Sequence, residues 1–194
     1  MPEDLITVVQ DNQLDPATYQ YYKCLEKRTI LFNMDIMDNI IETVYMPLKD
    51  FEDDDSVAPV TMYLHSSGGS VTDSLFLTSY LKSYKKKLNI YILGNCCSMA
   101  AVLVAACGKN PNITVYAYDT TYFLIHDGNI ALGAQEARTA ADLMAFNDKI
   151  DAKIRQIFIE NTNITEEQYD SHARHQWFFF ADEAKELGMI NEIL

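Results

Sequence analysis

Serine and histidine side chains that could catalyse acyl transfer stand at the ends of two predicted strands. Ser98 lies between the apolar run 88–93, which predicts a short buried strand, and the apolar run 102–106, which predicts a buried helix. At such a junction the hydroxyl faces unpaired amides and the partial positive charge of a helix N-terminus, which suits a nucleophile whose attack creates an oxyanion. The alternative role of a serine at this place is a helix N-cap.

His126 is the best candidate for the general base. It ends the predicted strand 121–125 and lies at a strand end, where loops carry function. Of the other histidines, His65 precedes a glycine turn, and His172 and His175 are three residues apart without a third ligand nearby. We therefore expect no metal site and no cofactor.

The turn Ser67-Gly68-Gly69-Ser70 follows one predicted strand and precedes a predicted helix. Glycine lets the backbone turn tightly and expose N–H groups, which can hold an oxyanion or a phosphate. The lysine of a P-loop and the G-x-G-x-x-G pattern are both missing, which disfavours the phosphate. A nucleophile, a base and an oxyanion hole are the three parts that acyl transfer by serine requires.

Length and composition restrict the class of protein. The 194 residues, 48% of them hydrophobic, predict one compact globular domain. A net charge of −13 argues against a nucleic-acid partner, because phosphate binding needs a basic face. Four cysteines in no zinc or disulfide pattern favour reduced thiols, and neither a signal peptide nor a membrane-spanning run is visible. We expect a cytoplasmic protein without membrane contact.

Alternating strands and helices predict an α/β fold of parallel β-α-β units. A polar, flexible arm is expected at 1–18, followed by a single domain at 19–194. The long helix at 133–161 either reaches out to a partner or packs in the core, and the apolar spacing allows both. The predicted strands cover 29–32, 60–64, 88–93, 114–118 and 121–125. The other predicted helices cover 37–48, 71–84, the segment after Ser98, a short capped helix from Thr165 and 181–187, with an acidic loop at 49–56.

Four segments together resemble the ClpP family, the proteolytic subunits of the Clp protease. They are LHSSGGSV at 64–71, GNCCSMAA at 94–101, LIHD at 124–127 and FADEAKELGMIN at 180–191. The resemblance runs from about residue 19 to residue 194. It implies the ClpP/crotonase-like fold, with the helix at 133–161 as the protruding handle.

The resemblance also implies roles for single residues. Ser98 matches the family's nucleophile, His126 its general base, and Gly69 and Met99 the positions whose amides form the oxyanion hole. The implied activity is a serine endopeptidase that hydrolyses unfolded polypeptides inside a chamber of two heptameric rings, a tetradecamer. An AAA+ Clp unfoldase feeds that chamber, and the arm at 1–18 falls where the family has axial pore loops.

The third member of the triad departs from the family pattern. Gln176 stands where the family has an aspartate, and Asp170 is the alternative if the loop runs differently. A glutamine can accept a hydrogen bond from the histidine Nδ1–H, but it lacks the charge that stabilises an imidazolium. Two further functions therefore stay open. One is a non-catalytic or weakly active paralogue in a mixed ring, and the other is a crotonase-like enzyme acting on a coenzyme A thioester.

Overall fold

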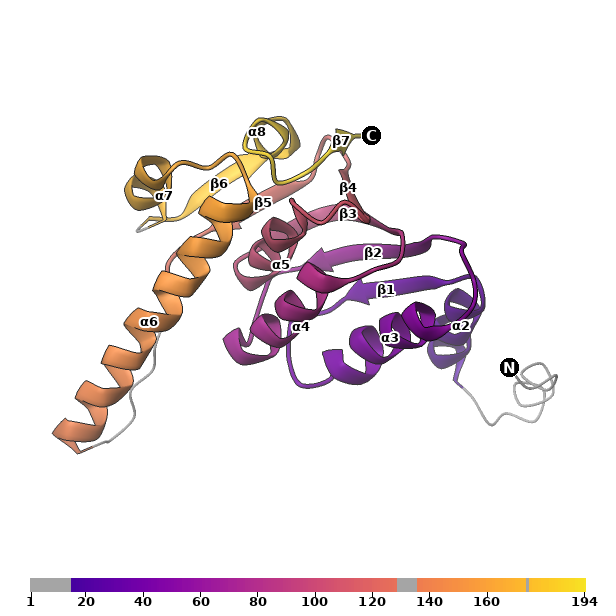
Figure 1. The fold of residues 1–194 in the computed structure, drawn as a ribbon, viewed down its shortest axis with the longest axis horizontal. Coiled ribbons are helices and arrows are strands. Elements are labelled where there is room, and N and C mark those ends of the chain that lie inside the picture. The colour runs from indigo at the N-terminus through magenta and orange to yellow at the C-terminus, as the bar shows by residue number, and fades with distance from the viewer. Residues whose placement is uncertain (1–14, 129–135, 174) are drawn as a thin grey trace.

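A computed structural model describes residues 15–128, 136–173 and 175–194 (Figure 1). Its centre is a seven-stranded sheet. Apolar side chains alternate along the first strands, and those on the inner face are fully buried, as a half-buried strand requires. The strands are β1 (Thr29–Asn33), β2 (Val60–Ser66), β3 (Leu88–Cys97), β4 (Ile113–Ala117), β5 (Tyr122–Ile125), β6 (Trp177–Phe180) and β7 (Glu192–Ile193).

The sheet branches along β3. Strands β1, β2, β3, β4 and β7 lie side by side in this order, and all of these pairs are parallel. The first half of β3 pairs with β4, whereas its last residues pair in parallel with β5, which in turn pairs antiparallel with β6. The change of partner occurs around Gly94, which has a φ of +73°, and a Cβ there would lie 2.9 Å from the His65 ring. Glycine is therefore required at the branch.

Helices pack against the sheet and against one another. Helix α5 is buried along its whole length, and α4 and α6 pack against it. Its alanines let these neighbours approach closely, so it forms the centre of the core. The helices are α2 (Pro16–Glu26), α3 (Met46–Asp53), α4 (Val71–Ser83), α5 (Met99–Cys107), α6 (Ala137–Asn161), α7 (Glu166–His172) and α8 (Ala181–Glu186), with a π-helical turn η1 (Ile41–Tyr45) before α3.

The long helix α6 projects from the body of the domain (Figure 1). Of its 25 residues, the buried ones are Ile157, Phe158 and Asn161, all in its last turns, where it packs against α5. Its first half exposes large apolar side chains at Leu143, Met144 and Phe146. The part of the helix that leaves the body therefore carries an apolar surface that the described residues leave exposed.

Several predicted boundaries needed correction. The prediction of an acidic loop at 49–56 is wrong for its first half, because α3 continues to Asp53. The arm predicted at 1–18 lies outside the described residues up to 14, but 16–18 form the first turn of α2. Asp15 caps that turn by accepting hydrogen bonds from two backbone amides. The long helix is described from Ala137, and the predicted start at 133 falls in 129–135, outside the described residues.

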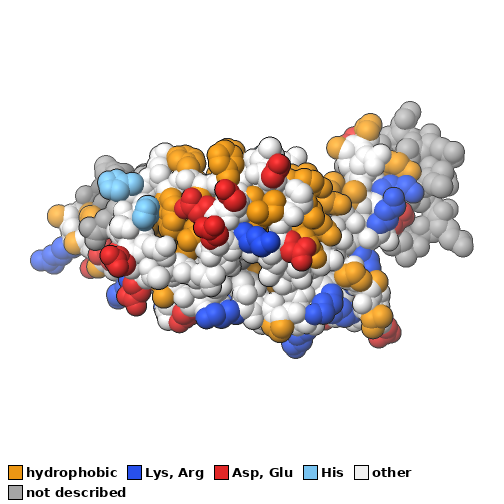
Figure 2. Space-filling model, turned by 90° about the horizontal axis from the view of Figure 1, so that it is seen from above, with side chains coloured by type: hydrophobic (Ala, Val, Ile, Leu, Met, Phe, Trp, Pro, Cys, Tyr) orange, Lys and Arg blue, Asp and Glu red, His pale blue; other side chains and the backbone are white. Residues whose placement is uncertain are grey.

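The surface carries acidic, basic and apolar side chains. Figure 2 shows one face, on which acidic side chains gather near the centre with hydrophobic side chains exposed between them. This face agrees with the net charge of −13. Among the helices that the structure describes, none has the length and apolarity that crossing a bilayer requires.

Candidate active site

Ser98 forms a sharp turn between β3 and α5. Its φ of +54° and ψ of −126° put a non-glycine residue in a strained backbone conformation. The surrounding chain fixes this turn, because the Ser98 amide donates to the Leu124 carbonyl at 2.8 Å and the Ser98 carbonyl accepts from the Ala101 amide at 2.9 Å. The hydroxyl makes no cap hydrogen bond to the helix. A strained strand-to-helix turn that exposes a serine hydroxyl is the geometry of a nucleophile elbow.

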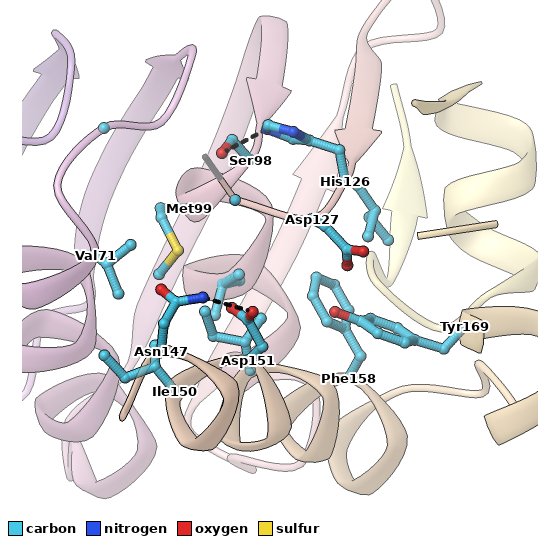
Figure 3. Close-up of a pocket in the computed structure, with 15 residues that line it drawn as sticks. Val71, Ser98, Met99, His126, Asp127, Asn147, Ile150, Asp151, Phe158 and Tyr169 are labelled. Atoms are coloured by element: carbon cyan, nitrogen blue, oxygen red, sulfur yellow. Dashed lines mark hydrogen bonds between the residues drawn. The ribbon is translucent and has the colours of Figure 1, made fainter. Parts of the chain in front are cut away.

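His126 lies beside that hydroxyl. Its Nε2 is 2.9 Å from Ser98 Oγ, the interaction drawn as a dashed line in Figure 3. The register explains why they meet: β3 and β5 are parallel, with Cys97 opposite Leu124, so both side chains come from the same edge of the sheet. This distance is within reach for proton transfer from a nucleophile to its base. The pairing expected from the sequence is therefore present as geometry.

Cys97 precedes the serine and is the competing nucleophile by position. Its side chain is buried, and burial raises the pKa of its thiol above the ordinary value. The attacking form of a cysteine is the thiolate, so a raised pKa makes this thiol inert near neutral pH. The half-buried Ser98, which lines the cavity, and not the neighbouring sulfur, carries the group that can react.

The glycine turn packs directly against the serine. Gly68 has a φ of +97°, and a Cβ there would lie 2.7 Å from Ser98 Cβ and 2.8 Å from the Cys97 carbonyl oxygen. Gly69 has a φ of +144° and abuts Ile36, whose carbonyl accepts from the Ser70 amide at 2.7 Å. Only glycine fits either position.

Two backbone amides beside the serine have no acceptor in the described parts of the chain. They belong to Gly69 and Met99, and both residues line the same cavity as Ser98 and His126. Met99 is the first residue of α5, where the helix leaves its amides unpaired and carries partial positive charge. A pair of free donors beside a nucleophile can hold a developing oxyanion.

The histidine has two candidate orienting residues. In the antiparallel pair of β5 with β6, Ile125 lies opposite Trp177, the last pair of the ladder, and His126 and Gln176 are the adjoining residues of the two segments. Gln176 is exposed, and His126 Nδ1 makes no hydrogen bond to any residue that the structure describes. Among the described residues His126 is thus contacted through Nε2, and Gln176 offers a neutral amide.

Asp170, the alternative orienting residue, faces a different partner. Arg155 Nε lies 2.7 Å from Asp170 Oδ1, and Arg155 Nη2 lies 2.9 Å from Asp170 Oδ2, a bidentate ion pair. Asp170 lines an adjoining hollow between α6 and α7, which shares Asp127, Asp151 and Tyr169 with the cavity that Ser98 and His126 line. Asp170 is therefore engaged by Arg155, whereas Gln176 adjoins the end of the β5–β6 ladder next to the histidine.

A cavity of about 250 Å³ opens beside Ser98 and His126 and extends toward α6. Its walls are largely apolar, and Asn147 and Asp151 of α6 lie across it from Ser98 and His126 (Figure 3). Sequence reasoning missed this role of α6. The available signal was an amide and a carboxylate four residues apart, which places them on one face of a helix.

His172, which the sequence places three residues before His175, contacts an aromatic ring and the backbone. The His172 ring stacks on Trp177 with 4.6 Å between ring centroids, and its Nδ1 lies 2.9 Å from the Gln168 carbonyl oxygen. Within the described segments, no three histidine, cysteine or acidic side chains lie close enough together to hold a metal ion.

Comparison with known protein families agrees with this architecture. The model of the Clp protease family matches residues 13–194, from just before α2 to the last residue. The match covers the strand-end serine, the histidine, the glycine turn and the projecting helix in one alignment. The chain therefore belongs to the Clp protease family.

Proposed function

We propose that this protein is a serine endopeptidase of the ClpP type, with Ser98 as nucleophile and His126 as general base. The observation that carries the proposal is the 2.9 Å distance between Ser98 Oγ and His126 Nε2. A serine that only capped α5 would turn its hydroxyl to the helix amides, and this one does not. Family membership alone does not assign activity, so the site geometry supplies the argument.

The reaction follows from these positions. Ser98 Oγ attacks the scissile carbonyl carbon while its proton passes to His126 Nε2, and the Gly69 and Met99 amides bind the oxyanion. The C–N bond then breaks, the leaving amine takes the proton from Nε2, and an acyl-enzyme ester remains. Water attacks the ester as His126 accepts its proton. Return of that proton to Ser98 Oγ releases the carboxylic acid product.

Gln176 is the residue we propose to orient the base, with Asp170 as the alternative. The mechanism requires an unprotonated Nε2, so the proton must sit on Nδ1 and needs an acceptor. The Gln176 side-chain oxygen can accept a hydrogen bond from the Nδ1–H after a rotation of this exposed side chain. It does not stabilise the imidazolium as a carboxylate would, so we expect slow turnover.

A weakly active paralogue is the second candidate function, and one observation favours it. No acceptor meets His126 Nδ1 among the described residues, and the neighbouring Gln176 is neutral. Such a chain would form part of a mixed ring and modulate a more active partner. The two candidates share the site geometry and differ in rate.

We further propose that the protein assembles into heptameric rings, paired as a tetradecamer, that degrade unfolded polypeptides fed by an AAA+ Clp unfoldase. The exposed apolar side chains of α6 support assembly, because a monomer gains nothing from leaving them in water. A second set of exposed aromatic side chains supports a further contact between subunits. They are Phe178 and Phe180 on β6 and Tyr122 on β5. Four free cysteines fit a reducing compartment, and we assign the protein to the cytoplasm.

Active-site labelling tests the proposed chemistry. A fluorophosphonate probe should label the wild-type protein, and labelling should disappear in Ser98→Ala and fall strongly in His126→Ala. Ser79→Ala removes an exposed hydroxyl on α4 that bonds only the Leu75 carbonyl, so it should label like the wild type. Labelling that survives Ser98→Ala would refute the assignment. Labelling with peptide hydrolysis too slow to measure would favour the paralogue.

A further inference from the structure

The cavity beside Ser98 combines apolar walls with an acidic end. Val71, Val102, Ile150 and Phe158 are among the side chains that form its walls. Figure 3 shows the Ser98–His126 pair on one side and the Asp151 carboxylate on the other. A side chain next to the attacked carbonyl would enter between them. Pockets of this kind gain affinity from their walls and selectivity from a few placed polar groups.

Asp151 is oriented but not neutralised. Its Oδ2 accepts a hydrogen bond from Asn147 Nδ2 at 2.9 Å, while its Oδ1 accepts none from the residues that the structure describes. Arg155, one turn further along α6, directs its guanidinium to Glu166 and Asp170 instead. The described residues that line the cavity include no lysine or arginine.

A second carboxylate adds to the negative charge. Asp127 follows the base and lines the same cavity, and Figure 3 shows its carboxylate directed away from the His126 ring. Burial, and then the charges of Asp127 and Asp148, raise the pKa of Asp151. Burial and the charges of Asp127 and Asp151 raise the pKa of Tyr169, at the same end, to about 12. Burial is the largest cause of both shifts, and the neighbouring carboxylates act in the same direction.

We propose that this cavity binds the side chain on the amino side of the cleaved bond, and that Asp151 selects lysine or arginine there. The proposal rests on the proposed peptidase function of Ser98. Lysine and arginine bury their aliphatic stems against apolar surface and keep a charged head at a polar group, which matches the walls and the acidic end. An apolar side chain of the same length would leave the carboxylate half-buried without a partner, at a cost in binding.

Matched peptide substrates test the proposal on the wild-type protein. Two fluorogenic peptides differ only in lysine or norleucine before the cleaved bond, so they share the stem and differ in the ammonium group. We expect kcat/KM to be at least about tenfold higher for lysine, the range of one charge-assisted hydrogen bond. In Asp151→Asn that preference should disappear, while norleucine cleavage continues. Asp148→Asn removes an equal charge from an exposed position on α6 that does not line the cavity, and it should keep the preference.

The outcomes separate the two proposals. Cleavage of both peptides at equal rates, or faster cleavage after norleucine, would overturn the selectivity and leave the peptidase function standing. A lysine preference that persists in a folded Asp151→Asn protein would overturn the role of Asp151. Hydrolysis of neither peptide, together with no labelling of Ser98, would overturn the peptidase function and the selectivity with it. The wild-type comparison decides the selectivity even if the variant fails to fold.

Discussion

Replacement of Gly68 by alanine should displace the backbone turn that carries Ser98. The added Cβ would lie 2.7 Å from Ser98 Cβ, 2.8 Å from the Cys97 carbonyl oxygen and 3.0 Å from the Met99 amide nitrogen. Two of these three atoms are backbone, so the turn that presents the nucleophile must move. The φ of +97° adds strain of its own for any residue with a Cβ.

The size of the effect follows from these contacts. The left-handed backbone conformation costs about 1–2 kcal/mol for alanine, and overpacking costs about 1–3 kcal/mol. Alanine also lowers the conformational entropy of the unfolded chain, which offsets about 0.4–1 kcal/mol of this destabilisation. We expect the free energy of unfolding to fall by about 2–4 kcal/mol, and labelling of Ser98 to slow by at least about tenfold, because displacement of Ser98 disturbs its contact with His126.

Urea denaturation at fixed protein concentration measures the first quantity, and fluorophosphonate labelling of the folded protein measures the second. Gly128→Ala is the matched control, because no atom lies within 4 Å of a Cβ built there, and its unfolding free energy should stay within about 0.5 kcal/mol of the wild type. A Gly68→Ala protein as stable and as readily labelled as the wild type would refute the close packing of turn and nucleophile.

Two further predictions concern charge. Gln176→Asp should raise kcat/KM for a peptide by about 10²–10⁴, because a carboxylate stabilises the His126 imidazolium, and an unchanged rate would exclude Gln176 as the orienting residue. The hydrogen bond from Lys86, with a further one from Arg28, holds the pKa of Asp54 at about 2, below its usual 3.8. A lowered folded pKa means that the ionised carboxylate stabilises the fold above pH 3.8, and that this contribution is lost as the pH falls toward 2. Urea midpoints at pH 4.5 and 2.5 should therefore differ less in Asp54→Asn than in the wild type, and equal differences would contradict this role.

Much of the fold could be predicted from short-range patterns. The alternation of apolar runs located β1 to β5, and the capping box predicted at Thr165 is present, with reciprocal hydrogen bonds to Gln168. The end of α3 was missed because acidic residues that favour loops also tolerate the last turn of a helix. The π-helical turn before it has no reliable signal in a single sequence.

The contact between the two main site residues was predictable from the sequence, but the residues on the far side of the cavity were not. Parallel strands end at the same edge of a sheet, so the meeting of Ser98 and His126 followed from their positions in the chain. The position of Asp151 could not be predicted, because it depends on how α6 packs across α5, a contact between distant segments. Spacing along one helix shows which residues share a face but not what that face meets.

The branch in the sheet has a consequence for the newly synthesised chain. The strand that carries the imidazole is held on one side by the tip of β3 and on the other by β6, more than fifty residues further along. Until β6 leaves the ribosome, β5 lacks one of its two neighbouring strands. The turn that carries Ser98 is synthesised earlier. The pairing that holds His126 beside Ser98 is therefore complete only after β6 has joined β5.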